Sequence, residues 1–156
     1  MKKINIVCVG NIKEKYLTDA VEEYAKRINK YFKLTVTEVA EEKPTAKLTD
    51  SDIKLIISRE ASRILPKLKG VVIALTIDGE RMDSVKFASK LDKLTDVDEV
   101  TFVIGGSYGL GQDVINNSNI KLSFSDMTFP HQLMRVILLE QIYRAGTIVA
   151  GATYHK

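Results

Sequence analysis

The sequence is poor in the features that mark secreted and membrane proteins. It has a single cysteine, Cys8, so no disulfide bond can form within one chain, which fits a reducing compartment. No apolar run is long enough to span a bilayer. The apolar segment near Met1 is too short for a signal peptide and is soon interrupted by Asn11, Lys13 and Glu14. We therefore predict a cytoplasmic protein with no membrane partner.

An excess of charge of one sign is also lacking. The chain has 23 Lys and Arg against 20 Asp and Glu, which gives a net charge of +3. This mildly basic balance is compatible with an RNA partner, but many proteins without one share it, since the distribution of charge matters more than its sum. There is no internal repeat, low-complexity segment or linker. Residues 1–156 are expected to form one domain that buries about 70% of the unfolded chain's surface.

Hydrophobic periodicity predicts an α/β fold with a largely parallel sheet flanked by helices. Strands are expected at 3–10, 34–39, 71–77, 99–104 and 120–124, and helices at 15–31, 50–65 and 110–116, with two more after Asp83 and near Pro130. Thr49 and Asp52 have capping-box spacing, and Asp83 can cap the helix after it. Asp78-Gly79 is expected to end the third strand in a turn. Pro130 suits the first turn of the last helix, because its missing N–H leaves nothing unpaired.

The last helix is apolar around most of its circumference, whereas a surface helix usually has one stripe about 100° wide. Its apolar residues are Met134, Val136, Ile137, Leu138, Leu139, Ile142, Tyr143, Ala145, Ile148 and Val149. Such a helix needs burial on more than one side, so we predict a homodimer in which a second subunit covers it. A charge at Leu139 is expected to dissociate or unfold the protein. Glu140 and Arg144 have the favourable i,i+4 order of an ion pair.

A glycine-rich segment, Gly105 to Gly111, directly follows the strand at 99–104. Glycine allows close approach of a backbone to a ligand, and open α/β sheets bind ligands at the carboxyl ends of their strands. The segment lacks the Lys-Ser/Thr of a P-loop, and its spacing does not match a dinucleotide fingerprint. The residues alone leave a ligand-binding loop and a plain tight turn equally favoured.

Three segments together carry a resemblance to a known family. They are FVIGGSYGL at 102–110, the S-x-MTFPHQLxR-x-xLLEQIYRA stretch, and the terminal YHK. They resemble the RlmH family of large-subunit rRNA methyltransferases, which belongs to the knotted SPOUT class and uses S-adenosylmethionine (SAM). The resemblance extends over the whole chain and is most specific from Phe102 to Lys156. It implies a C-terminal trefoil knot, which no periodicity argument predicts, because knots are rare.

The resemblance also implies a cofactor site built from three loops. Leu75 would line the adenosine pocket, and Gly105 would make a backbone contact with the cofactor, beside Gly106 and Gly109. The third loop comprises Phe124, Ser125, Asp126, Met127, Thr128 and Phe129, which offer the apolar walls and polar backbone groups that an adenine needs; Ser125 and Thr128 can alternatively cap a helix. Valine at Gly105 is expected to abolish SAM binding while the fold survives. No metal is expected, because the methyl group of a sulfonium is already electrophilic.

The implied reaction is methylation of N3 of a pseudouridine in 23S rRNA, on the assembled ribosome. The acceptor must lose a proton, and the chain has only two histidines. His131 is favoured as a cap and loop organiser. Tyr154, His155 and Lys156 form a tail that its position alone predicts to be disordered, but an aromatic that can stack on a base beside a cation favours a substrate-facing role. We assign His155 and Tyr154 to catalysis and leave the general base open.

Substrate contacts are predicted for Arg135, Arg144 and Lys156; the two arginines can alternatively pair with Glu140. Two other functions stay open at this point. One is a related knotted methyltransferase that acts on tRNA, and the other is a nucleotide-binding, ribosome-associated factor without catalytic activity. SAM binding separates the second from the enzymes, and the choice between ribosomes and tRNA as methyl acceptor separates the enzymes from each other.

Overall fold

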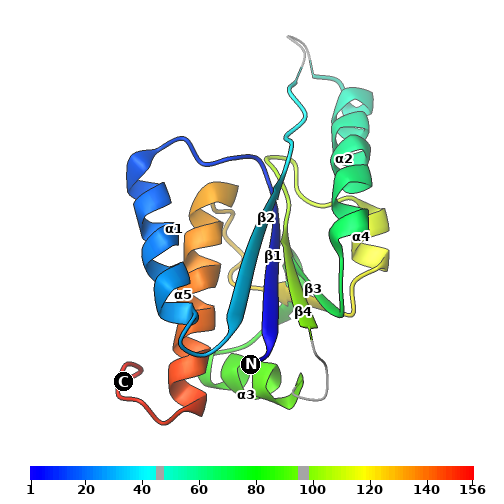
Figure 1. Cartoon of the computed structure of the whole chain (residues 1–156). Helices are drawn as coiled ribbons and strands as arrows, with labels where there is room; N and C mark the ends of the chain where they lie inside the picture. The colour runs from blue at the N-terminus through cyan, green and yellow to red at the C-terminus, as the bar shows by residue number, and fades with distance from the viewer. Residues whose placement is uncertain (45–47, 95–98) are drawn as a thin grey trace.

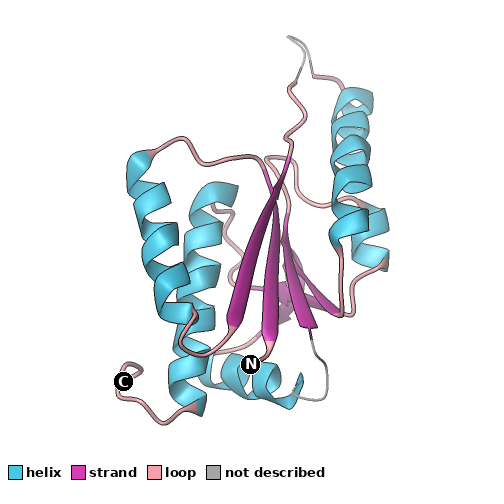
Figure 2. Ribbon diagram, viewed as in Figure 1, coloured by secondary structure: helices cyan, strands magenta, loops and turns pink. Residues whose placement is uncertain are grey.

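A single parallel sheet forms the centre of the molecule (Figures 1 and 2). The computed structural model describes residues 1–44, 48–94 and 99–156. Within them the strands are β1 (Lys3–Val9), β2 (Lys33–Val39), β3 (Val71–Arg81), β4 (Glu99–Ile104) and β5 (Ile120–Ser123). Their order is β2-β1-β4-β3-β5, and every neighbouring pair is parallel. The predicted α/β class and parallel sheet are confirmed.

Helices cover both faces of this sheet (Figure 1). One face carries α1 (Lys15–Ile28), α3 (Ser84–Lys93) and α5 (His131–Val149), and the other carries α2 (Asp50–Ile64), the short η1 (Leu65–Lys67) and α4 (Gln112–Asn116). In the part of the chain that the structure describes, no helix is both long and apolar enough to cross a membrane.

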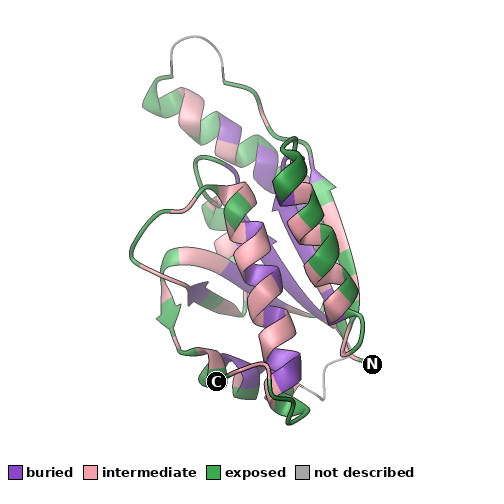
Figure 3. Cartoon of the chain, turned by 90° about the vertical axis from the view of Figure 1, so that its left-hand side faces the viewer, coloured by how far each residue is buried: buried purple, intermediate pink, exposed green. Residues whose placement is uncertain are grey.

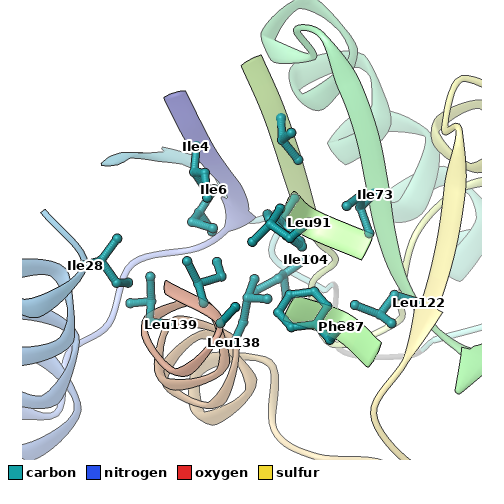
Figure 4. Packing of buried hydrophobic residues seen from close by; sticks show 14 of the residues in the cluster. Ile4, Ile6, Ile28, Ile73, Phe87, Leu91, Ile104, Leu122, Leu138 and Leu139 are labelled. Atoms are coloured by element: carbon teal, nitrogen blue, oxygen red, sulfur yellow. The ribbon is translucent and has the colours of Figure 1, made fainter. Parts of the chain in front are cut away.

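The strands contribute side chains to two hydrophobic clusters, one on each face of the sheet, because successive side chains of a strand point to opposite faces. In β1, Ile4, Ile6 and Cys8 join the cluster under α1, α3 and α5 (Figure 4). Val7 and Val9 join the cluster under α2 and α4. Cys8 is fully buried, and burial raises the pKa of its thiol to about 11. It therefore serves as a small core residue, as its apolar surroundings predict.

The predicted helix starts are largely confirmed. Thr49 and Asp52 form a reciprocal capping box, and the Asp83 carboxylate accepts the N–H of Lys86. Pro130 differs from the prediction: with ψ at 135° it is the N-cap of α5 and not part of the first turn. The helix predicted at 15–31 ends at Ile28, because the following residues turn into β2.

The third strand does not end at Asp78-Gly79, so that prediction is wrong. β3 shifts register after Leu75 and pairs again with β5, Glu80 opposite Leu122 and Arg81 opposite Ser123. A Cβ atom added at Gly79 would lie 2.8 Å from the backbone of Leu122. This glycine therefore permits close packing of two strands and does not form a terminating turn.

The long helix α5 has a buried face and a partly covered face (Figure 3). Leu138, Leu139, Ile142 and Ala145 lie in the core under the sheet. At 100° per residue, the outward face comprises Leu133, Ile137, Glu140, Arg144 and Ile148. Leu139 is 0% exposed within a single chain, so a charge there disrupts the core and cannot report on a dimer. The homodimer itself stays a prediction.

Candidate active site

A cavity of about 810 Å³ opens at the carboxyl ends of β4 and β5, beside the part of β3 where the strand register shifts. Its walls are formed by Leu75–Ile77 within β3, by the segments that follow β4 and β5, and by the start of α5. Its volume lies in the range of pockets that bind small molecules. It is lined by Leu75, Thr76, Ile77, Ile104, Gly105, Gly106, Ser107, Tyr108, Gly109, Leu122, Phe124, Ser125, Met127, Thr128, Phe129, Pro130, His131, Gln132 and Met134.

The structure thus brings the three predicted cofactor segments together around one cavity, although Leu75 lies within β3 and not at the start of a loop. All the residues predicted to contact the cofactor line it except Asp126, which forms an ion pair with Arg81. That the lining residues bind SAM stays a prediction. Sequence reasoning missed Thr76, Tyr108 and Met134, although each lies beside a predicted residue or one helical turn beyond the loop.

The glycine loop after β4 is folded tightly on itself. The N–H of Gly109 donates to the carbonyl of Gly106 at 3.1 Å. A Cβ atom at Gly105 would lie 2.6 Å from the carbonyl carbon of Gly109 and 2.9 Å from the nitrogen of Leu110. An added side chain there therefore deforms the loop before it meets any ligand. This refines the expectation that valine at Gly105 acts by blocking the cofactor alone.

The loop between β5 and α5 is held by its own serines. The hydroxyl of Ser123 donates to the carbonyl of Ser125 at 3.1 Å, and the hydroxyl of Ser125 accepts the N–H of Met127 at 3.0 Å. Ser125 thus fixes the loop and does not cap α5. Opposite this loop, the buried hydroxyl of Thr76 has no hydrogen-bond partner in the structure. Because unpaired buried polar groups are costly, it is suited to bind a polar atom of a ligand.

Arg135 lies on the inner side of α5, where it ties that helix to the sheet. It is 2% exposed, and its guanidinium donates to Glu38 Oε2 at 2.6 Å and to the carbonyl of Gly10 at 2.9 Å. This burial contradicts the prediction that Arg135 binds substrate. It also shows that Arg135 pairs with Glu38 and not with Glu140.

His131 lies at the first position of α5 and lines the cavity. Its Nε2 atom is buried and unpaired, and α5 has no side-chain cap bond, so the predicted capping role is wrong. A Cβ atom at Gly10 would lie 3.3 Å from Glu41 Oε2 and 3.7 Å from His131 Nε2, so both groups lie over Gly10. Burial lowers the pKa of His131; Glu41 acts to raise it and Arg135 to lower it.

The C-terminal tail is folded back onto α5, contrary to what its position alone predicts. The hydroxyl of Tyr154 donates to Glu140 Oε2 at 2.8 Å, and its ring lies 4.8 Å from the ring of Tyr143. Arg144 pairs with Glu140 at 2.8 Å, which was the alternative to its predicted substrate contact, and its guanidinium lies over the Tyr154 ring. The tail is therefore anchored by the Glu140–Arg144 pair.

These contacts fix how the tail can exchange protons. Burial, with the hydrogen bond to Glu140, raises the pKa of Tyr154 to about 12. Nη1 of Arg144 lies 3.0 Å from Nδ1 of His155. A guanidinium only donates hydrogen bonds, so Nδ1 must accept, and the His155 ring carries its proton on Nε2. In this conformation the hydroxyl proton of Tyr154 is used by Glu140, and the Nε2–H of His155 is the donor that the tail presents.

Cavity and tail lie at different levels of α5. His131 lines the cavity, whereas Arg144, which holds the tail, comes 13 residues later, about 20 Å along the axis. Figure 1 shows the C-terminus beside the far end of α5. In this conformation the tail of a chain does not reach the cavity of the same chain.

Glu60 is a buried carboxylate behind the glycine loop that sequence reasoning missed. It is 3% exposed, its Oε2 accepts the N–H of Glu42 at 3.0 Å, and its Oε1 has no partner. A Cβ atom at Gly106 would lie 3.0 Å from Oε1. Burial raises the pKa of Glu60; Glu41 adds to this, and the Glu42 N–H opposes it.

We expect Glu60→Gln to change the pH dependence of stability. With a raised folded-state pKa, the folded protein binds more protons than the unfolded chain, so the free energy of unfolding falls as pH rises above about 4.3. Glutamine removes this loss, so the variant gains stability relative to the natural protein as pH rises. Urea denaturation across this range measures the difference. Glu22→Gln, at an exposed position of α1, is the matched control; equal slopes for Glu60→Gln and the natural protein contradict the prediction.

Comparisons with known proteins assign the chain to a family. A family model described as "Predicted SPOUT methyltransferase" matches residues 1–155. The chain belongs to the SPOUT methyltransferase family. Listeria monocytogenes has a relative named Ribosomal RNA large subunit methyltransferase H, which is 49% identical over 98% of this chain and 99% of its own length. A Methanococcus maripaludis relative is 51% identical over the same shares.

Solved structures of the SPOUT methyltransferase fold agree. The tRNA (m1G37) methyltransferase of Aquifex aeolicus has a TM-score of 0.57 at 13% identity, over 99% of this chain and 74% of its own. A Legionella pneumophila structure with bound SAM has a TM-score of 0.52 at 11% identity, over 92% of this chain and 66% of its own. At such identities the likeness concerns the fold alone.

Family membership confirms the resemblance on which the sequence interpretation rests. The protein is therefore a methyltransferase, and the alternative of a factor without catalytic activity is wrong. The SPOUT assignment also implies the C-terminal trefoil knot.

Proposed function

We propose that this methyltransferase uses SAM to methylate N3 of a pseudouridine in large-subunit rRNA, on the assembled ribosome. The substrate class is inferred from a relative named for large-subunit rRNA. The chain is 49% identical to it over nearly the full length of both proteins. The tRNA methyltransferase likeness supports only the fold, because its identity is 13%. The nucleotide and the assembled substrate follow from the family resemblance of the motifs at 102–110 and 154–156.

The cavity fits SAM in size and chemistry. Leu75, Phe124 and Phe129 offer apolar walls for an adenine, and the hydroxyl of Thr76 is available for a hydrogen bond. Gly105 and Gly106 line the cavity, and their missing side chains let this loop pack closely against Gly109 and Glu60. When bound, SAM supplies an electrophilic methyl group. Among the residues that the structure describes, no group of three or more His, Cys, Asp and Glu side chains is placed to hold a metal ion.

The tail is the proposed substrate-facing element. Tyr154 can stack on a base, and Lys156 with Arg144 can contact phosphate. Since the tail of one chain lies away from its own cavity, it must act at the cavity of a second subunit. Leu133 and Ile137 offer that subunit an apolar surface beside the cavity, and Leu133 is 39% exposed. We therefore infer a homodimer in which each site combines the cavity of one chain with the tail of the other.

Mass mapping of rRNA from cells with and without the protein tests the function. We expect one methyl group to disappear from a large-subunit pseudouridine when the protein is absent. Purified protein with labelled SAM is then offered assembled ribosomes, isolated large subunits, free rRNA and tRNA. Transfer to ribosomes supports the proposal, and transfer to tRNA alone would establish the rival function.

Mixing two inactive variants tests the shared site. Gly105→Val removes the cavity, and deletion of 154–156 removes the tail. We expect each variant alone to be inactive and an equal mixture, unfolded and refolded together, to recover about a quarter of the natural rate, because half the dimers are mixed and each has one complete site.

A mixture of Gly105→Val with a chain that carries both changes is the control. It should stay inactive, because no dimer in it contains an intact cavity. A mixture of the first two variants that stays inactive, while the mixed dimer is seen by mass spectrometry, would contradict the shared site.

A further inference from the structure

We propose that His131, backed by Glu41, is the general base that takes the proton from the methyl acceptor. The assignment rests on the proposed transfer of a methyl group to a nitrogen that carries a proton. It gives a chemical role to a buried histidine that the cofactor site does not require.

The tail does not supply a base in this structure. The Tyr154 hydroxyl donates to Glu140, and the Nδ1 lone pair of His155 is occupied by Arg144. The Nε2–H of His155 can instead donate a hydrogen bond to a carbonyl oxygen of an imide, on which negative charge develops as its N–H is lost. With only two histidines in the chain, the remaining imidazole is that of His131.

His131 has the position that a base needs. Its ring lines the cavity beside the loop at 124–129, at the N-terminus of α5. The positive end of a helix dipole disfavours a cation there, and burial lowers the pKa of His131. Both effects keep the imidazole neutral, and so able to accept a proton, at neutral pH.

Glu41 is placed to stabilise the imidazolium that results. Its Oε2 and His131 Nε2 lie over the same point of Gly10, at 3.3 and 3.7 Å from where a Cβ would be. Glycine at this position leaves the space between the two side chains open. Ser107, on the glycine loop, lies 3.4 Å from Glu41 Oε1 through its hydroxyl. The carboxylate thus connects the proposed cofactor loop to the histidine.

The other charged groups near His131 are Arg135 and Glu38, which form an ion pair with each other. Arg135 faces the histidine from the next turn of α5 and acts to lower its pKa. This guanidinium is itself paired with Glu38 of β2 at 2.6 Å. Glu41 is therefore the charged neighbour that can respond when His131 becomes a cation.

The proposed step combines transfer of the methyl group with loss of a proton from the acceptor nitrogen. The acceptor nitrogen forms a bond to the methyl carbon while the C–S bond breaks, and the sulfur keeps that electron pair. The N–H proton passes to Nδ1 of His131, because Nε2 is buried over Gly10. The products are the methylated base, a neutral thioether and an imidazolium that faces Glu41, which later releases its proton to solvent.

Single-turnover methylation of ribosomes at saturating SAM tests the assignment. We expect His131→Gln to lower the rate by about 10²–10⁴-fold while SAM binding, measured by calorimetry, is retained. In the natural protein the rate rises with pH as His131 loses its proton, and this limb disappears in His131→Gln. Glu41→Gln removes the group that raises the pKa of His131, so the limb moves to lower pH while the plateau rate falls. An unchanged limb in His131→Gln overturns the proposal.

Two further readouts separate this assignment from the proposed function. Added imidazole should restore part of the rate of His131→Ala, which a purely structural role would not allow. NMR titration of His131 in the protein without substrate should show a lower pKa in Glu41→Gln than in the natural protein; equal values overturn the Glu41–His131 pair. If the natural protein methylates no rRNA, the proposed function is overturned. The NMR titration needs no substrate, so it still tests whether Glu41 raises the pKa of His131.

Discussion

Valine at Gly105 is expected to weaken SAM binding by about 10–10²-fold, because overpacking costs about 1–3 kcal/mol and displaces the loop that forms the cavity wall. The Cβ atom alone would lie 2.6 Å from the backbone of Gly109. Calorimetric titration with SAM measures the loss. Circular dichroism establishes that the rest of the fold remains, since Gly105 lies at the end of β4 and outside the two core clusters.

Gly151→Ala is the matched control for this variant. Gly151 has φ +73° and no atom within 4 Å of an added Cβ. Alanine there introduces backbone strain of about 1–2 kcal/mol without touching the cavity, so SAM binding should equal that of the natural protein. Natural affinity in folded Gly105→Val would contradict the assignment of this loop to the cofactor.

Glutamate at Leu133 is expected to separate the dimer into folded monomers, whereas glutamate at Leu139 is expected to unfold the chain. Leu133 is 39% exposed on the outward face of α5, and Leu139 is 0% exposed beneath it. An unpaired charge in the core costs several kcal/mol, a large part of the 5–15 kcal/mol that stabilises a typical domain. A charge at Leu133 faces water in a monomer and an apolar surface in the proposed dimer.

Light scattering and circular dichroism distinguish these outcomes. Leu133→Glu should have the mass of one chain and a natural spectrum, and Leu133→Ala should remain dimeric as the control. A natural protein that is a stable monomer at micromolar concentration would exclude the dimer, and with it the shared site.

The sequence predicted the sheet because β1, β3 and β4 contain nearly continuous apolar runs, as strands of a parallel sheet buried on both faces do. It predicted two of the cavity segments because chain order places 105–109 and 124–129 directly after β4 and β5, whereas 75–77 was predicted to end its strand and lies within β3. For the glycine-rich segment, the family resemblance favoured a ligand-binding loop over a plain tight turn. The end of β3 was missed because Asp78-Gly79 has turn composition, while the second pairing with β5 depends on a distant strand.

Buried polar groups were the least predictable part of the site. Arg135, Glu60 and His131 have polar side chains that single-sequence patterns place at the surface or at a helix end. Arg135 pairs with Glu38 and Glu60 accepts the N–H of Glu42, while Glu41 lies near His131 over Gly10; all three glutamates come from the end of β2 or the segment that follows it. Such pairings depend on tertiary structure. The folded tail was missed for the same reason, because Glu140 and Arg144 hold it from the preceding helix.

Helix α5 carries a cavity residue at one end and the residue that anchors the tail further along. It therefore fixes both the distance between them and the angle between them about the helix axis. His131 and Arg144 are separated by a rigid rod of about 20 Å. One residue inserted between them would advance the anchor by about 1.5 Å and rotate it by about 100°, which points the tail away from its former direction. An insertion in this helix would therefore change the direction of the tail more than its distance from the cavity. Loops elsewhere can grow, but the spacing between His131 and Arg144 is fixed by helical geometry.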